Sequence, residues 1–175
     1  MRPIFLIGYM GCGKSTLGRM VSSLTGISFI DLDNYIEGRY HASVSQLFAE
    51  RGERGFRDIE RAMLHEVGEF EDVIVACGGG TPCFFDNMDY RNQQGLTVYL
   101  KADPEVLYNH LLMGKVERPL IKGKSPEELI TFIRQQLEKR EPFYTKANYT
   151  LDVSLMDNYE KIKISVDKIK ELLDL

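Results

Sequence analysis

The feature of this 175-residue chain that most constrains its fold is a glycine-rich loop, which follows the apolar run at 4–7. The segment Gly8-Tyr-Met-Gly-Cys-Gly-Lys-Ser15 fits the pattern G-x-x-x-x-G-K-[ST], and residues 14–25 continue with a helical pattern. A strand before the loop and a helix after it are the context in which this motif binds nucleotide phosphates. The sequence therefore predicts a nucleoside triphosphate site at the first strand-to-helix connection.

The residues of this loop have distinct expected tasks. Glycines let consecutive backbone N–H groups turn toward the phosphates, and the positive end of the following helix strengthens the attraction. Lys14 is expected to reach the β- and γ-phosphates, and Ser15 to bind Mg²⁺. The residues predicted to contact ATP in this loop are Gly11, Cys12, Gly13, Lys14, Ser15 and Thr16.

Apolar runs of strand length alternate with longer helical stretches along the chain. The predicted strands are 4–7, 28–33, 72–76, 96–102 and 149–154, and the predicted helices are 14–25, 34–69 with breaks near Ser43 and Gly52, 104–113, one beginning near Ser125, and 157–173. This alternation, with continuously apolar strands, favours a parallel sheet covered by helices on both faces. At this length we expect a single α/β domain over residues 1–175.

Composition and charge exclude several classes of protein. The net charge of −4 argues against nucleic acid as the main partner, because binding a phosphate backbone requires a basic surface. No apolar run reaches the length of a membrane-spanning helix, and the first residues show no secretory signal pattern. Cys12, Cys77 and Cys83 lack the paired spacing of a zinc site, so we interpret them as small buried side chains in a reducing cytoplasm.

Two acidic residues stand at the end of the second predicted strand. Asp31 and Asp33 are two positions apart, so on a strand both point to the same face, and ligands bind at the carboxyl ends of such strands. One carboxylate can hold Mg²⁺ through a water molecule while the other accepts a proton from a substrate hydroxyl. The alternative is that Asp33 caps a helix starting at Asn34, with Asp31 merely solvated.

Residues farther along the chain have the chemistry of an anion site. Arg57 and Glu60 are neighbours on a predicted helix, and the planar fork of arginine suits a carboxylate, although the pair alone also fits a solvated helix surface. Gly78–Gly80 follow the run at 72–76 and indicate either backbone packed closely on a ligand or a tight turn. Arg140, at the end of a long predicted helix, has the position of a second clamp.

One segment has the composition of a mobile loop. Residues 113–126 are rich in Gly, Lys and Pro and show no periodicity. The segment carries Arg118, which we expect to close over ATP and to stabilise the charge of the transferring phosphoryl group.

Taken in chain order, these motifs resemble the pattern of the shikimate kinase family. The matching segments, between residue 4 and about residue 152, are Gly8–Ser15, Asp31-Leu-Asp33, Phe56-Arg57-Asp-Ile-Glu60, Gly78–Gly80, Arg118-Pro-Leu120 and Arg140-Glu-Pro-Phe-Tyr144. The resemblance implies a three-layer P-loop kinase fold, with a five-stranded parallel sheet and a mobile lid around residues 113–125. It also implies ATP-dependent phosphorylation of the 3-hydroxyl of shikimate, in aromatic amino-acid biosynthesis, by a cytoplasmic monomer.

The resemblance also assigns roles to individual residues. The implied shikimate contacts are Asp33, Arg57, Gly79 and Arg140. Arg57 and Arg140 would bind the carboxylate, with Glu60 orienting Arg57. The implied catalytic residues are Lys14, Asp33 and Arg118, of which Asp33 is the candidate proton acceptor and Arg118 also contacts ATP. The implied Mg²⁺ site consists of Ser15 and Asp31, the latter through water.

Two other functions compete with this interpretation. One is a small kinase of similar core that acts on gluconate or on a nucleoside monophosphate, and the triple glycine together with R-x-P-x-Y argues against it. The other is a nucleotide-dependent switch without an acceptor substrate. A switch has no need for Asp33, Arg57 and Arg140 to converge on a second site.

Overall fold

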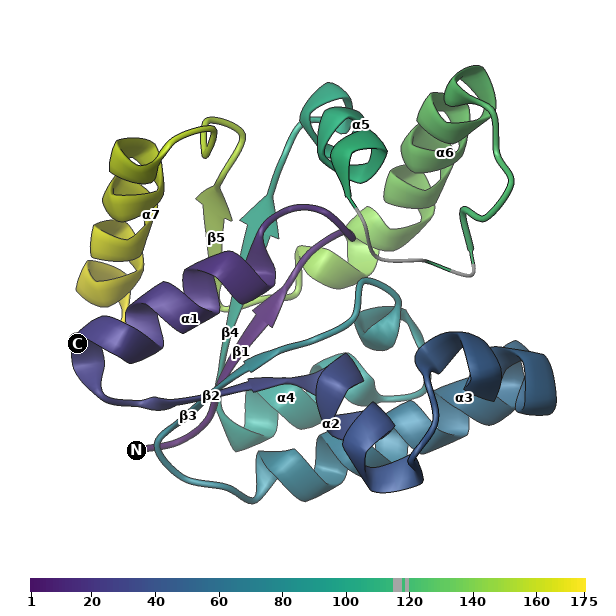
Figure 1. The fold of residues 1–175 in the computed structure, drawn as a ribbon. Helices are drawn as coiled ribbons and strands as arrows, with labels where there is room; N and C mark the ends of the chain where they lie inside the picture. Colours follow the sequence, from purple (N-terminus) through teal and green to yellow (C-terminus); the bar gives the residue numbers. More distant parts are fainter. Residues whose placement is uncertain (115–117, 119) are drawn as a thin grey trace.

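The computed structural model describes residues 1–114, 118 and 120–175, and these residues form three layers, helices on both faces of one sheet (Figure 1). The strands are β1 (Ile4–Ile7), β2 (Ser28–Asp31), β3 (Val73–Ala76), β4 (Leu96–Lys101) and β5 (Tyr149–Asp152). All neighbouring strands are parallel and their order is β2-β3-β1-β4-β5, which puts β1 in the middle. The expected five-stranded parallel sheet is confirmed.

Helices connect the strands and continue beyond them. They are α1 (Lys14–Thr25), α2 (Leu32–Tyr40), α3 (Val44–Gly68), a 3₁₀ turn η1 (Thr81–Cys83), α4 (Asn87–Gln94), α5 (Pro104–Met113), α6 (Pro126–Tyr144) and α7 (Tyr159–Leu172). The predicted break near Ser43 lies between α2 and α3, and Ser43 caps α3. The second predicted break is a kink inside α3 at Gly52, whose φ is 69°.

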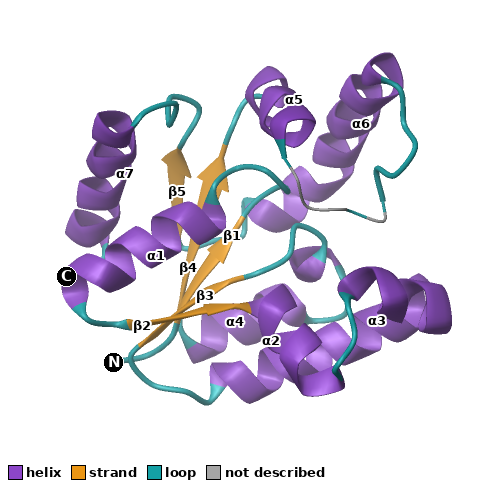
Figure 2. Ribbon diagram, viewed as in Figure 1, coloured by secondary structure: helices purple, strands orange, loops and turns teal. Residues whose placement is uncertain are grey.

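Successive residues of β1 point to opposite faces of the sheet and so belong to two different cores. Ile4 and Leu6 pack with apolar residues of α1 and α7, whereas Phe5 and Ile7 pack with residues of α2, α3 and α4. Figure 2 shows the same division, with α1 and α7 on one side of the strands and α2, α3 and α4 on the other. Because both faces are covered, every residue of β1 is buried.

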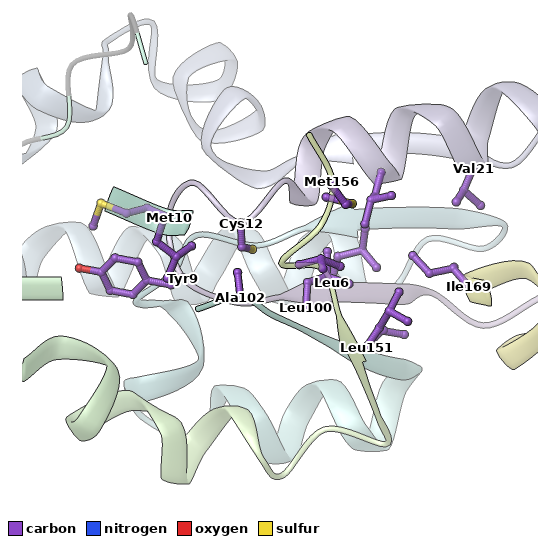
Figure 3. Packing of buried hydrophobic residues seen from close by; sticks show 14 of the residues in the cluster. Leu6, Tyr9, Met10, Cys12, Val21, Leu100, Ala102, Leu151, Met156 and Ile169 are labelled. Carbon is purple, nitrogen blue, oxygen red and sulfur yellow. The ribbon is translucent and has the colours of Figure 1, made fainter. Parts of the chain in front are cut away.

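The loop at residues 8–13, which we call the phosphate loop, joins β1 to α1 at the carboxyl end of the sheet. Gly8, Gly11 and Gly13 all have positive φ, which residues with a side chain rarely adopt. A Cβ at Gly8 would also lie 2.5 Å from the carbonyl oxygen of Leu100. Cys12, in the same loop, lies beside Leu100 and Ala102 in the buried cluster (Figure 3). The loop is therefore packed directly on β4.

The end of the second strand differs from the expected one. The strand was expected to run to Asp33, but β2 ends at Asp31 and α2 begins at Leu32. The reason is a cap, because Oδ1 of Asp31 accepts a hydrogen bond of 3.2 Å from the backbone N–H of Asn34. Asp31 and Asp33 therefore do not share one face of a strand, and the helix is capped by Asp31 and not by Asp33, so both predictions for this pair are wrong.

Helix α4 has no counterpart among the predicted elements. Its buried face consists of Asn87, Met88 and Arg91, so two of its three buried residues are polar. A buried face of this composition produces no apolar periodicity, which is the signal by which amphipathic helices are recognised.

The segment expected to be a lid lies between α5 and α6. Helix α6 begins with a capping box, in which Ser125 and Glu128 satisfy each other's backbone N–H groups. Residues 115–117 and 119 of the predicted lid lie outside the described residues, so its mobility stays a prediction. Within the described part of the chain, no helix combines the length and the apolar character needed to cross a bilayer.

Candidate active site

Two adjoining cavities open at the carboxyl ends of β1, β2 and β3. One, of about 430 Å³, lies along the phosphate loop and is lined by Lys14, Ser15 and Thr16. The other, of about 580 Å³, is lined by Arg57, Glu60 and Arg140. Residues common to the two linings are Met10, Ser15, Asp31, Asp33, Gly78, Gly79 and Arg118. The two spaces therefore form one site with a phosphate-loop side and an arginine side.

On the phosphate-loop side, Lys14 lies against the backbone of the loop. Its Nζ donates to the carbonyl oxygens of Gly8 at 2.8 Å and Tyr9 at 3.0 Å. These bonds place the ammonium group inside the curve of the loop, where the expected phosphates would lie. The residues predicted to contact ATP that line this cavity are Gly11, Gly13, Lys14, Ser15, Thr16 and Arg118, whereas Cys12 is buried behind it.

Ser15 and Asp31 form a hydroxyl–carboxylate pair at the boundary between the two cavities. The Ser15 hydroxyl donates to Oδ2 of Asp31 at 2.6 Å, while Oδ1 caps α2. A hydroxyl and a carboxylate are hard oxygen ligands of the kind Mg²⁺ prefers, and Mg²⁺ usually takes its remaining ligands from phosphates and water. Among the described residues no cluster of three or more His, Cys, Asp or Glu could hold a metal by itself. The pair fits a metal held jointly with a nucleotide.

Asp33 lies in the first turn of α2, and its carboxyl group faces both cavities. Burial, together with the negative charges of Glu60 and Asp31, raises the pKa of Asp33 to about 7, while Lys14 and Arg118 act in the opposite direction. Such a pKa lets the carboxyl group take up and release a proton near neutral pH. This is the property required of a general base.

Arg57 and Glu60 are buried, so the alternative of a solvated helix pair is wrong. Arg57 is 4% exposed and Glu60 is 1% exposed, and Nη1 of Arg57 donates to Oε1 of Glu60 at 3.0 Å. The ring of Phe84 lies 4.3 Å from the Arg57 guanidinium carbon, which is cation–π distance. Glu60 and the aromatic ring hold the guanidinium in one orientation at the wall of the larger cavity.

The glycine triplet packs against the charged groups of the site. A Cβ at Gly80 would lie 2.5 Å from Nη2 of Arg57, and one at Gly79 would lie 3.2 Å from Nη1 of Arg140. A Cβ at Gly78 would lie 3.2 Å from Oε2 of Glu60. The three glycines are therefore a close approach of backbone to the site as well as a turn.

Arg140 reaches the site from the last turns of α6. It is 6% exposed, its guanidinium carbon lies 5.4 Å from the ring centre of Tyr9, and Nη1 has no hydrogen-bond partner among the described residues. Tyr144, one turn later, donates its hydroxyl to the carbonyl oxygen of Gly79. A buried guanidinium with an unused N–H group at a cavity wall is suited to bind an anion.

The chain matches a known protein family over most of its length. The family model for shikimate kinase matches residues 10–173. The chain belongs to the shikimate kinase family. A shikimate kinase of Parabacteroides distasonis is 60% identical over 89% of this chain and 90% of that protein.

Solved structures of shikimate kinases agree with this assignment. A crystal structure of shikimate kinase from Bacteroides thetaiotaomicron shares 50% identity, with a TM-score of 0.96 over 99% of each chain. A shikimate kinase from Acinetobacter baumannii in complex with shikimate shares 30% identity, with a TM-score of 0.85 over 99% of this chain and 94% of that one. The expected P-loop kinase fold is confirmed by both.

Several contacts at the site were not predicted from the sequence. His110 of α5 lines the phosphate-loop side, with its Nδ1 2.7 Å from the carbonyl oxygen of Gly11. Tyr9 and Phe84 flank the two arginines, and Thr81 donates to Glu60. Each of these contacts joins residues far apart in the chain, so no local pattern in the sequence predicts them.

The three cysteines are free thiols. Cys12 and Cys77 are buried as expected, and burial raises the pKa of Cys77 to about 11. Cys83 differs by being only partly buried.

Proposed function

We propose that this protein transfers the γ-phosphoryl group of ATP to the 3-hydroxyl of shikimate, giving shikimate 3-phosphate and ADP in aromatic amino-acid biosynthesis. The observation that carries the proposal is that Arg57 and Arg140, both almost fully buried, line a cavity that meets the phosphate loop at Asp33. Membership of the shikimate kinase family supports the same substrate.

The arginine side of the site is where shikimate would bind. Arg57, oriented by Glu60, and Arg140 would bind the carboxylate, because two forked cations match a small planar anion. The backbone of Gly79 would contact the ring, since it lies within reach of both Arg140 and the phosphate loop. Holding the carboxylate at this end directs the ring hydroxyls toward Asp33.

Asp33 would bind the ring hydroxyls and accept the proton of the attacking one. Its pKa of about 7 means that a substantial fraction is ionised at neutral pH and that the protonated form is also accessible. The negative charges of Asp31 and Glu60 nearby increase the proton affinity of the ionised form. The proton therefore has an acceptor at the meeting point of the two cavities.

The phosphate-loop side would hold ATP and neutralise the transferring group. Lys14 would exchange its bonds to the loop carbonyls for bonds to the β- and γ-phosphates, and Arg118, which lines the same cavity, would also contact the phosphates. Preorganised positive charge around a loose phosphoryl group is the main source of catalysis in such transfers. The remaining contacts would be made by Gly11, Cys12, Gly13, Ser15 and Thr16.

Mg²⁺ is the cofactor that the Ser15–Asp31 pair fits. Ser15 would bind the ion directly and Asp31 through a water molecule, which requires the hydroxyl–carboxylate bond of 2.6 Å to open. When bound, the ion supplies charge neutralisation between the β- and γ-phosphates.

The decisive experiment is a coupled ADP-release assay with a panel of acceptors. We expect shikimate to stimulate ATP consumption with formation of a phosphate ester, whereas gluconate and AMP do not. Equal turnover with gluconate would contradict the proposed substrate and favour a sugar-acid kinase. ATP hydrolysis that none of the acceptors stimulates would favour a nucleotide-dependent switch.

We also propose that the protein works as a monomer in the cytoplasm, with no nucleic-acid or membrane partner. The net charge of −4 supports a small-molecule enzyme, and its free thiols are compatible with a reducing compartment. Size-exclusion chromatography with light scattering tests the monomer directly, and a mass of two chains would contradict it.

A further inference from the structure

Glu60 has a second partner that the kinase motifs do not include. Oε1 of Glu60 accepts from Arg57 at 3.0 Å, and Oε2 accepts from the hydroxyl of Thr81 at 2.7 Å. Thr81 is fully buried, at 0% exposure, and Glu60 is 1% exposed. A buried carboxylate keeps a fixed position only when both oxygens are hydrogen-bonded, because an unpaired oxygen has a large desolvation cost.

Thr81 is itself held at three points. Its backbone N–H donates to the carbonyl oxygen of Gly78 at 3.1 Å, which closes the glycine turn. Its backbone carbonyl accepts from Nδ2 of Asn87 at 2.9 Å, and Asn87 is also fully buried. The hydroxyl bond to Glu60 is the third connection. Thr81 therefore joins the glycine turn, the Arg57–Glu60 pair and helix α4.

The connection continues into α4. Nε of Arg91, another fully buried residue, donates to the backbone carbonyl of Asn87 at 3.2 Å. Starting from the cavity wall, the bonds run from Arg57 to Glu60, Thr81, Asn87 and Arg91. The polar buried face of α4, which leaves this helix without an apolar pattern in the sequence, is thus the far end of a chain of hydrogen bonds that starts at the site.

We propose that Thr81 is a positioning residue for the carboxylate of shikimate, acting through Glu60 on the orientation of Arg57. The inference rests on the proposed function, because it concerns how the acceptor is bound. Thr81 lines neither cavity, so we expect it to make no contact of its own with the substrate. Its effect is expected on shikimate binding and not on the phosphate-loop side.

The test compares Thr81→Val with Thr81→Ser in the full-length protein. Valine keeps the shape and removes the hydroxyl, whereas serine keeps the hydroxyl. We expect Thr81→Val to raise the KM and Kd for shikimate about tenfold, as for loss of a hydrogen bond to a charged group. We expect kcat and the KM for ATP to stay within about twofold of the wild-type values. The lost interaction binds shikimate equally in the ground state and in the transition state, so its removal changes KM and not kcat. Thr81→Ser should bind shikimate as wild type does, because it keeps the hydroxyl.

The matched control is Thr97→Val. Thr97 is also 0% exposed, and within the described part of the chain its hydroxyl has no hydrogen-bond partner. The substitution is the same, at a site of equal burial, without the link to Glu60. We expect the KM for shikimate to stay at the wild-type value in this variant.

The possible outcomes separate the two proposals. Wild-type protein without shikimate-dependent ADP release overturns the proposed function, and the role of Thr81 falls with it. If wild type is active and Thr81→Val binds shikimate normally, or weakens ATP and shikimate equally, only the role of Thr81 is overturned. Should Thr81→Val fail to fold in a thermal melt, Thr81→Ala, which also lacks the hydroxyl, takes its place in the same comparison.

Discussion

Arg57 and Glu60, three residues apart on α3, form a buried ion pair of 3.0 Å at the wall of the larger cavity. Nη1 of the guanidinium donates to Glu60, Nη2 donates to Glu53 at 3.3 Å, and the guanidinium carbon lies 4.3 Å from the ring centre of Phe84, so these contacts fix the orientation of the cation. Buried pairs of this kind are not efficient sources of stability, because removing both charges from water costs about as much as their attraction returns. Their presence here is better explained by the binding of an anion.

The first prediction concerns Arg57→Ala. We expect shikimate binding to weaken by about 2–5 kcal/mol, the usual effect of truncating one member of a buried charge pair, with ATP affinity little changed. Calorimetric titration with each ligand measures both values. Arg61→Ala is the control, because Arg61 is on the same helix but pairs with Asp86 at the surface. Equal loss of ATP and shikimate binding would mean that Arg57 serves the fold.

The second prediction concerns the pH dependence of catalysis. Asp33 must be ionised to accept a proton, and its pKa is raised to about 7. We therefore expect kcat/KM for shikimate to rise with pH through about pH 7 and then to level off. The measurement is made with Mg²⁺ and ATP saturating at each pH. Asp33→Asn should lose most of the activity at every pH. A wild-type profile that is flat from pH 5.5 to 8 would contradict this role.

The third prediction is that the same carboxyl group destabilises the fold at neutral pH. Its pKa is higher in the folded than in the unfolded state, so the unfolded state gains more from ionisation as pH rises. The contribution of Asp33 to the free energy of unfolding is fully present below about pH 4 and is lost as the pH rises from about 4 to about 7. We expect Asp33→Asn to be more stable than wild type at pH 8 by about 1–3 kcal/mol, with the gain vanishing near pH 4.

Urea unfolding at the two pH values measures this difference. Asp167→Asn, on the exposed surface of α7, is the control. Its effect on the free energy of unfolding should be small and the same at pH 4 and pH 8. A gain from Asp33→Asn that is the same at pH 4 and pH 8 would show that its cause is packing and not ionisation.

The fourth prediction concerns the metal. Ser15→Ala removes the hydroxyl that pairs with Asp31 and that we expect to bind Mg²⁺. The concentration of Mg²⁺ giving half-maximal activity should rise about tenfold or more, the usual effect of altering a metal site. Ser23→Ala, on the exposed side of the same helix, should leave the Mg²⁺ titration unchanged. Identical titrations for both variants would exclude Ser15 as a ligand.

The fifth prediction tests the close packing of the glycine triplet. In Gly80→Ala the new methyl group would lie 2.5 Å from Nη2 of Arg57, so the guanidinium must turn away. We expect a higher KM for shikimate with little change in the KM for ATP. Gly38→Ala is the matched control, because a methyl group there meets nothing within 4 Å and α2 should gain slightly in stability. Unchanged shikimate kinetics in Gly80→Ala would mean that Arg57 has freedom to move.

Much of the fold is readable from local patterns in this chain. Helix α1 has the predicted bounds because its start is marked by the glycine loop and its end by Gly26, whose positive φ closes the helix. The central strands are readable because a strand buried on both faces is a continuous apolar run. Helix α4 and the end of β2 cannot be read from the sequence in this way, since a polar buried face and a capping aspartate both depend on partners elsewhere in the chain.

By itself, the sequence determined which chemistry is present: a phosphate loop, acids near the end of the second strand, and arginines with a glycine triplet. These signals are local, because they depend on residue type and spacing along a few turns or strands. The tertiary structure alone decided that Arg57 and Glu60 are buried, that Asp33 belongs to a helix, and that Thr81 completes the bonding of Glu60. Burial and hydrogen bonding between distant segments set the direction of a charge and the pKa of a carboxyl group, and neither is encoded in any single stretch of the chain.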